Sequence, residues 1–394
     1  MTLPTFIMRI LVLLYFLAFL FACDSGSIEI SNVEVNDGNI ELQVVDSLII
    51  QTLPSETYIQ DIHPINGNIL LMQRKGRGQI LMEVDANGTI LQTFEQPSEG
   101  PQRVGSDLIS ACYYEQGFAL MGSFGYLLIT DNRFEPITRK RIPMGYNLVA
   151  YPGFRHLQVL NIRGKSLLVM FYGPHTEINN TEAAYYQEYD LLSIYDPETE
   201  EFSPLGSLSE TSVFLNGKAH YFLDTRFQVV GEQVKAVISS EDLLYTFEAI
   251  NGEVSVHQIP FDEFVLKDGY SLGDQGLDEQ EEIREISGTI RSFLQVDDKQ
   301  IFMYSSGLPL STRQAIAGNG KDEEAWVKLR KALPNKYLIT QDGKAISEII
   351  PFPEKIGYLA AVDAGGNIWA SQNVDALDQE PEVITLYKLR IIEN

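Results

Sequence analysis

A repeated unit of short strands is the feature that most constrains the fold of this chain. From about residue 40 onward, apolar and polar residues alternate with a period of two, and β-branched and aromatic residues are frequent. Five segments share a pattern in which a pair of strands is followed by a polar turn and a further strand. These strand pairs begin at Ile69 and Ile80, Phe118 and Tyr126, Ser166 and Leu191, Val234 and Leu243, and Gln300 and Lys336. A sixth unit occupies residues 357–389.

Such a unit corresponds to one four-stranded sheet, which cannot bury both of its faces alone, so neighbouring sheets must stack around an axis. The six units therefore predict an all-β fold, a six-bladed β-propeller of four-stranded blades over residues 40–394. The strand at residues 41–50 precedes the first unit and has no hairpin partner. We expect it to complete the last blade and close the ring, which removes the exposed edges of an open sheet.

The chain is longer than six minimal blades, which need about 40–45 residues each, so about 100 residues must lie in insertions. The candidate insertions are residues 172–190, 262–286 and 311–335. The third contains one predicted helix, at residues 321–333, which ends before Pro334. Its apolar positions fall on one helical face, namely Ala325, Trp326, Leu329, Ala332 and Leu333. The fold prediction thus includes one short helical insertion.

The first 22 residues have the layout of an export signal peptide. Arg9 is the only early positive charge, and the apolar run that follows, residues 10–21, is too short to span a bilayer. Leu20-Phe21-Ala22-Cys23 resembles the lipobox of bacterial lipoproteins, and this resemblance implies that Cys23 becomes the acylated first residue of the mature chain. Polar residues dominate 23–39, as expected of a tether between lipid and domain. The alternative is an ordinary secretory peptide with a coincidental cysteine, or a short buried helix.

Composition narrows the possible partners. The only other cysteine is Cys112, so stability must come from a core, and 44% hydrophobic residues suffice for one large domain. The net charge of −25 argues against nucleic acid as a partner, because phosphate binding needs clustered Lys and Arg. Solubility explains the acidic charge, and an acidic functional surface is the alternative.

The lipobox, the six degenerate units and residues 95–101 (EQPSEGP) together resemble a known group of proteins. From Cys23 onward the chain is similar to the six-bladed propeller lipoproteins common in Bacteroidetes, in which a Gly-Pro-containing loop follows the first blade. The resemblance implies a lipid-anchored location in the cell envelope, at the outer membrane, facing the periplasm or the cell surface. Those families are largely uncharacterised, so no catalytic residue is implied.

Arginines recur at the predicted blade entrances. Arg155, Arg226 and Arg291 each stand just before a strand that runs into Gln-Val, and Arg103, after Gly100-Pro101, is a fourth candidate. The innermost strands of a propeller begin at one mouth of the central channel, so these arginines predict a positive ring there. Guanidinium groups bind carboxylates and sulfates through paired N–H donors. The alternative is that each arginine pairs with a nearby acid or stacks on an aromatic ring to join blades.

His156 and His220 lie beside these arginines and are further candidates for the ligand site, with a purely structural role as the alternative. No two histidines have the spacing of a zinc motif, and we expect no metal and no cofactor. No nucleophile elbow is present, and we expect Cys112 to be a buried, inert thiol. Carboxylates are too numerous for any pair to be chosen as catalytic.

The sequence therefore predicts a non-enzymatic binding module, anchored to a membrane and presenting its channel mouth to an anionic ligand or an envelope protein. Two alternatives remain at this point. In the first, the protein is a hydrolase or lyase that acts on a glycan or small ester at the channel mouth. In the second, it is a scaffold whose three insertions make the contacts.

Overall fold

The computed structural model describes residues 40–393, apart from positions 54, 76–77, 124–125, 144–153, 173–177, 222, 250–251, 281, 378 and 380. The signal peptide at residues 1–22, the lipidation of Cys23 and the tether at residues 23–39 lie outside the described residues. These parts of the prediction are therefore not tested by the structure.

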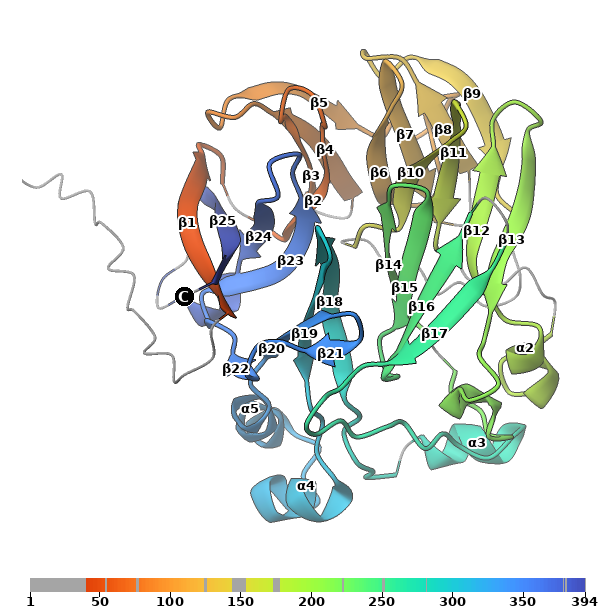
Figure 1. The fold of residues 1–394 in the computed structure, drawn as a ribbon, viewed down its shortest axis with the longest axis vertical. Coiled ribbons are helices and arrows are strands. Elements are labelled where there is room, and N and C mark those ends of the chain that lie inside the picture. The colour runs from red at the N-terminus through yellow and green to blue at the C-terminus, as the bar shows by residue number, and fades with distance from the viewer. Residues whose placement is uncertain are drawn as a thin grey trace, which may run out of the picture. The chain divides into compact units, whose positions relative to one another are not determined.

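The described residues form six antiparallel sheets, and in the first five the strands follow chain order from the inside outward (Figure 1). The first blade contains β2 (Thr57–Ile62), β3 (Ile69–Lys75), β4 (Gly78–Val84) and β5 (Ile90–Glu95). The second contains β6 (Leu108–Tyr114), β7 (Gly117–Gly122), β8 (Tyr126–Thr130) and β9 (Pro136–Arg141). The third contains β10 (Leu157–Ile162), β11 (Lys165–Met170), β12 (Asp190–Asp196) and β13 (Glu201–Ser207).

The fourth blade contains β14 (Thr225–Val230), β15 (Gln233–Ile238), β16 (Leu243–Glu248) and β17 (Val254–Gln258). The fifth contains β18 (Thr289–Val296), β19 (Lys299–Ser305) and β20 (Lys336–Gln341). Its outer edge is interrupted, because β21 (Lys344–Ala345) and β22 (Ile350–Pro351) pair with different parts of β20. The predicted six-bladed, all-β architecture is confirmed.

The last blade joins the two ends of the propeller. Its strands are β23 (Ile356–Val362), β24 (Ile368–Gln372) and β25 (Ile384–Glu393), and its outermost strand is β1 (Ile40–Ile50). β1 pairs antiparallel with β25, from Ile40 opposite Glu393 to Ile50 opposite Ile384. The prediction that residues 41–50 close the ring is thus confirmed.

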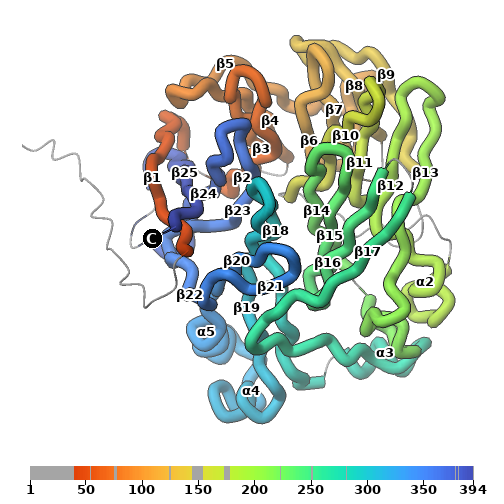
Figure 2. The backbone as a smooth tube through the Cα atoms, viewed as in Figure 1, coloured from red at the N-terminus to blue at the C-terminus, as the bar shows by residue number. Residues whose placement is uncertain are grey.

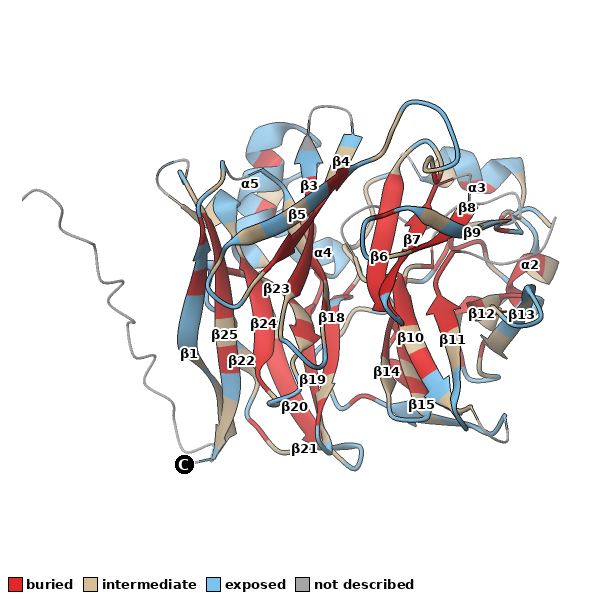
Figure 3. Ribbon diagram, turned by 90° about the horizontal axis from the view of Figure 1, so that it is seen from above, coloured by how far each residue is buried: buried red, intermediate tan, exposed pale blue. Residues whose placement is uncertain are grey.

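The innermost strands form the inner wall of the ring (Figures 1 and 2). Each innermost strand contacts the next one around the ring, in the order β2, β6, β10, β14, β18, β23 and back to β2. Every residue of β6 is buried, whereas the outer strand β9 alternates between half-buried and exposed positions (Figure 3). An inner strand lies between two neighbouring blades, so both of its faces meet apolar side chains, and an outer strand has one face in water.

The topology places the long connections on one face of the ring. Because the strands alternate in direction, every blade-to-blade connection and every second-to-third-strand connection lies on the same side, which we call the loop face. First-to-second and third-to-fourth connections lie on the opposite side, the turn face. All three predicted insertions belong to the loop face. So do all the described helices, α2 (Ala183–Gln187), α3 (Asp274–Glu279), α4 (Leu310–Ala317), α5 (Glu323–Ala332), η1 (Val213–Leu215) and η2 (Val374–Ala376).

The predicted helix is confirmed as α5, which begins where the Asp322 carboxylate accepts a hydrogen bond from the backbone N–H of Ala325. Only Ala325 and Leu329 of the predicted apolar face are buried, and Trp326 remains 46% exposed. Helices α2, α3 and α4 were not expected. They have eight residues or fewer, too few to show a helical period in the sequence.

Candidate functional site

Three of the four predicted arginines meet at the loop-face mouth of the central channel. A hollow of about 50 Å³ lies at this mouth, and the described residues of its lining include Arg155, Arg226 and Arg291 but no acidic residue. Aromatic side chains complete its wall, namely Tyr58, Phe154, Phe227, Phe293 and Tyr358. These residues come from five of the six blades, because each lies at or near the start of an innermost strand. We call this hollow the arginine mouth.

Irregular pairing occurs at two of the lining positions. In β18 the register shifts between Ile290 and Ser292, so Arg291 is the extra residue of a β-bulge. In β23 the register shifts between Ile356 and Leu359, a segment that contains Tyr358. Bulges bend a strand and redirect a side chain, and they are frequent beside binding sites.

In two of the three repeats of the Arg-Gln-Val pattern the glutamine joins blades. Gln158 donates to the carbonyl of Phe227 (2.7 Å) and accepts from the backbone N–H of Val229 (3.0 Å), which links the third blade to the fourth. Gln228 makes the same pair of bonds with the backbone of Gln295 in the fifth blade. The glutamine of the third repeat, Gln295, donates instead to the carbonyl of Asp297 in its own blade (2.6 Å). In all three repeats the arginine is the part of the pattern that reaches the channel mouth.

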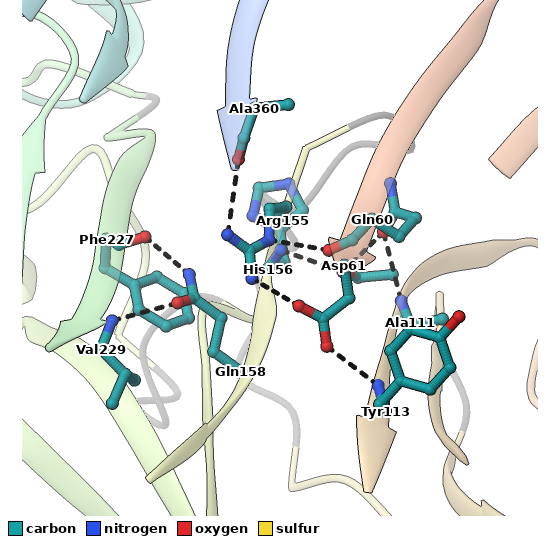
Figure 4. A network of polar contacts seen from close by, with 11 residues as sticks. Gln60, Asp61, Ala111, Tyr113, Arg155, His156, Gln158, Phe227, Val229 and Ala360 are labelled. Atoms are coloured by element: carbon teal, nitrogen blue, oxygen red, sulfur yellow. Dashed lines mark hydrogen bonds and ion pairs between the residues drawn. The ribbon is translucent and has the colours of Figure 1, made fainter. Parts of the chain in front are cut away.

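Arg155 reaches across the channel and links its own blade to two others (Figure 4). Its Nη2 lies 2.8 Å from Asp61 Oδ1, its Nε donates to the carbonyl of Gln60 (2.7 Å), and its Nη1 donates to the carbonyl of Ala360 (3.4 Å). The other carboxylate oxygen of Asp61 accepts from the backbone N–H of Tyr113 (3.0 Å). All three guanidinium nitrogens have partners, so Arg155 has the blade-joining role given above as the alternative.

Arg226 has a different environment, in which much of its hydrogen-bonding capacity is unused. Its Nη2 lies 2.5 Å from Asp224 Oδ2, and its guanidinium carbon lies 3.3 Å from the centre of the Phe154 ring. Nε and Nη1 are buried and have no hydrogen-bond partner among the described residues. A buried donor without an acceptor costs about 1–3 kcal/mol, and more for a charged group. Burial lowers the pKa of Arg226 and raises the pKa of Asp224.

Arg291 is the exposed member of the group. Within the described part of the chain it makes no ion pair and no hydrogen bond through its side chain. Its positive charge acts on Arg226, where it contributes to the lowered pKa. With Arg155 paired to Asp61 and Arg226 paired to Asp224, the charge of Arg291 is left uncompensated. The arginine mouth is thus locally positive in a chain of net charge −25.

The remaining predicted site residues do not line the arginine mouth. Arg103 lies in the connection after β5, where its Nε donates to the carbonyl of Gly105 (3.0 Å) and Nη1 to that of Ser98. His156 is 1% exposed and packs against the rings of Phe154 and Phe171, directly behind the mouth. These placements give Arg103 a loop-bracing role and His156 a packing role.

Sequence reasoning missed the aromatic wall. Tyr58 stands two residues before Gln60, as Arg226 stands two residues before Gln228. Aligning the inner strands on their glutamines would therefore have placed Tyr58 at the mouth. Phe154 and Tyr358 have no such signal, because Phe154 precedes its strand and Tyr358 lies in an irregular segment.

The turn-face end of the channel has a larger cavity of about 850 Å³. Arg155 and Asp61 both line it, and Arg155 also lines the arginine mouth. The ion pair between them therefore lies between the two hollows. The two ends of the channel differ in charge, since the turn-face cavity is also lined by the carboxylates of Glu83 and Glu115.

His220, the last predicted site residue, is fully buried in the connection between β13 and β14. Its ring meets the edges of Phe214 and Tyr186, and Nε2 lies 3.2 Å from Asn216 Oδ1. Lys267 donates to its backbone carbonyl. Burial, followed by the positive charge of Lys267, lowers the pKa of His220 to about 4.

This buried histidine predicts loss of stability in mild acid. A histidine in an unfolded chain has a pKa of about 6.5. Between about pH 6.5 and 4, His220 is therefore protonated in the unfolded chain and neutral in the folded one. Stability contributed by neutral His220 is full above pH 6.5 and falls as the pH decreases, by about 2–3 kcal/mol at pH 4.5. In urea unfolding at pH 7 and 4.5, His220→Phe should remove that part of the acid-induced loss. The exposed His257→Phe is the control, and equal losses in His220→Phe and wild type would contradict the prediction.

The described residues contain no cluster of three or more His, Cys, Asp or Glu side chains that could hold a metal ion. Cys112 is fully buried, and burial raises the pKa of its thiol well above the ordinary value. The thiol is therefore protonated and shielded, which agrees with the expected inert cysteine.

Comparison with known proteins supports the fold. No protein-family model matches the chain, and no curated protein matches it. Among solved structures, it is similar to a member of the DUF4221 family from Bacteroides vulgatus, with a TM-score of 0.60 and 11% sequence identity over 91% of this chain and 100% of that one. The two proteins share a fold. This agrees with the resemblance to Bacteroidetes propeller proteins found in the sequence.

A second similar structure is that of a candidate exported protein from Bacteroides fragilis. Its TM-score is 0.49 and its identity 12%, over 91% of this chain and 97% of that one. Within the described residues, none of the helices has the length and apolar character needed to cross a membrane.

Proposed function

We propose that this protein is a binding module of the cell envelope, held at the membrane through lipid on Cys23, and that its arginine mouth binds an anionic group. The observation that carries the proposal is the guanidinium of Arg226. Its Nε and Nη1 are buried in the wall of the hollow without acceptors among the described residues. An anion entering the mouth would supply those acceptors.

The surroundings of Arg226 favour an anion over a neutral ligand. Asp224 and Phe154 hold the guanidinium in place before a ligand arrives, so little side-chain entropy is lost on binding. Arg291 adds a second guanidinium with all its donors available, and no carboxylate belongs to the part of the lining that the structure describes. Hydrogen bonds to charged groups contribute about 1.5–3 kcal/mol each, so removing one arginine should weaken binding about 10- to 100-fold.

Thermal unfolding of the purified chain in sulfate or acetate, at constant ionic strength, tests the anion site. A ligand that binds only the folded state raises the unfolding midpoint, so we expect both anions to raise it in wild type. Arg291→Met should abolish most of the rise while leaving the ligand-free midpoint nearly unchanged, because Arg291 is exposed. Arg226→Lys, which keeps the charge but loses two of the donors, should reduce the rise.

Arg133→Met is the matched control, since Arg133 is an exposed arginine in a turn-face connection. It should respond to anions like wild type. An anion response that survives in both Arg291→Met and Arg226→Lys would show that the anions act elsewhere and would remove the proposed site.

The proposed lipid anchor on Cys23 needs a separate experiment. The proposal of this anchor is based on the sequence Leu20-Phe21-Ala22-Cys23. In cells fed a labelled fatty acid, wild type should incorporate the label and Cys23→Ser should not. Equal labelling of the two proteins would refute lipidation of Cys23.

A further inference from the structure

The arginine mouth continues into a second hollow on the loop face. This neighbour, of about 270 Å³, lies between the last and the first blade, and we call it the side groove. Tyr58, Tyr358 and Ser371 line both hollows. A single ligand can therefore occupy the two together.

Aromatic rings line the arginine mouth and the side groove on a shared side. Arg226 stacks on Phe154, and the ring of Phe154 meets that of Tyr358 edge to face, with 5.7 Å between centres. Tyr358 and Tyr58 then face the side groove from β23 and β2. Both tyrosines are only partly buried, so their rings are accessible to a ligand.

The side groove differs from the mouth in charge and in hydrogen-bonding groups. Among the described residues its lining contains no lysine or arginine, and it contains two carboxylates, that of Asp375 and that of Glu56, which pairs with Arg74 outside the lining. Most of its other polar side chains are hydroxyls and amides, from Ser55, Thr57, Asn335, Ser371, Gln372, Asn373 and Thr385. Such a surface suits a ligand part that carries hydroxyl groups, and it repels a second anionic group.

Resting on the anion site proposed above, we propose that the ligand is a sugar carrying a single carboxylate or sulfate. The anionic group occupies the arginine mouth and the ring lies in the side groove against Tyr58 and Tyr358. Size supports this division. The side groove, of about 270 Å³, is the larger of the two hollows and has room for a ring, whereas the arginine mouth, of about 50 Å³, has room for a small anionic group. Aromatic faces and polar groups together are typical of small-molecule sites.

Calorimetric titration of the purified full chain with glucuronate, acetate and glucose tests the proposal. We expect glucuronate to bind at least about 10-fold more tightly than acetate, which lacks the ring, and than glucose, which lacks the charge. Tyr358→Ala should reduce the advantage of glucuronate over acetate while acetate still binds. Tyr58→Phe, which keeps the ring, should retain the advantage.

A charge change that leaves the fold intact gives a second test. Asp375 is exposed in η2, so Asp375→Arg should not disturb the core. Wild type should bind a sulfated glucuronate, in which the same sugar ring carries a second anionic group, at least about 3-fold more weakly than glucuronate, and Asp375→Arg should reverse this preference. Glu135→Arg, at an exposed turn-face position, is the matched control and should leave the preference unchanged.

The possible outcomes separate the two proposals. If acetate and glucuronate bind equally and Asp375→Arg changes nothing, the sugar-acid inference is overturned while the anion site stands. If no anion binds, or if glucose binds as tightly as glucuronate, the anion site itself fails.

Discussion

A chain that begins at residue 51, and so lacks β1, should lose most of the stability of the propeller. β1 is the outermost strand of the last blade, and without it that blade loses its outer strand and the backbone pairing that joins the two ends of the propeller, so only the packing of β23 and β24 against the first blade remains there. Leu48 and Ile50 are 8% and 0% exposed in the cluster that joins the last blade to the first. Burial of one such side chain contributes about 1.5–3 kcal/mol, and a whole domain has a stability of only about 5–15 kcal/mol.

Thermal unfolding followed by circular dichroism compares this truncated chain with one that begins at residue 40. We expect the longer chain to unfold in one cooperative transition and the shorter one to lose it or to melt at a much lower temperature. Ile50→Ala in the longer chain isolates the side-chain part and should cost about 2–5 kcal/mol. Its neighbour Ile49 is 50% exposed, so Ile49→Ala is the control and should cost less than about 1 kcal/mol. Equal midpoints for the two chain lengths would show that β1 does not close the ring.

Replacement of Arg155 by methionine should lower the free energy of unfolding by about 3–5 kcal/mol. The side chains of Arg155 and Asp61 are 16% and 17% exposed, so the pair is largely shielded from water. Without Arg155, Asp61 keeps a buried charge that lacks its counterion, and the carbonyls of Gln60 and Ala360 lose a donor. Removal of one partner of a buried ion pair costs more than the pair itself contributes.

Three further variants separate the charge from the packing. Arg155→Met combined with Asp61→Asn should recover part of the loss, because no unpaired charge remains. Arg74→Met is the control, since Arg74 pairs with Glu56 on the surface with both side chains more than half exposed, and it should cost less than about 1 kcal/mol. A loss in Arg155→Met no larger than that in Arg74→Met would contradict a bridging role across the channel.

The Arg155→Met deficit should also depend on pH. Burial raises the pKa of Asp61, and the positive charge of Arg155 opposes this rise. In the variant the pKa of Asp61 therefore rises further. A carboxyl group whose pKa is higher in the folded than in the unfolded chain destabilises the fold as the pH increases through the range above its ordinary pKa. Denaturant unfolding should show a smaller deficit at pH 4.5 than at pH 7. A deficit that is the same at both pH values would mean that the charge of Asp61 is not its cause.

The local sequence pattern was sufficient to predict the six-bladed architecture. The period-two alternation and the polar turns identify strands because they depend on neighbours within a few residues, and six units of four strands have few ways to bury their faces. The unpartnered strand at residues 41–50 indicated closure for the same reason. The α5 helix followed from its own period and from Pro334. The three shorter helices carry too few turns for such a signal.

The composition of the arginine mouth was only partly predictable. Arg155, Arg226 and Arg291 could be grouped because each precedes an innermost strand, and those strands begin at one end of the channel. Arg103 and His220 lie in connections between blades, and the side chain of each bonds within its own connection. Their positions near a strand in the sequence therefore did not bring them to the mouth.

The sequence by itself determined the number of blades, the closing strand and the arginines that precede the inner strands, since each of these depends on local periodicity and spacing. Only the tertiary structure decided what each arginine does. Asp61 lies 94 residues from Arg155 along the chain and becomes its partner only when the ring closes. The same closure leaves Arg226 between Asp224 and Phe154 with two donors unused. Whether a guanidinium joins blades or is available to a ligand depends on which groups the ring brings within hydrogen-bond distance, and that is a property of packing between blades.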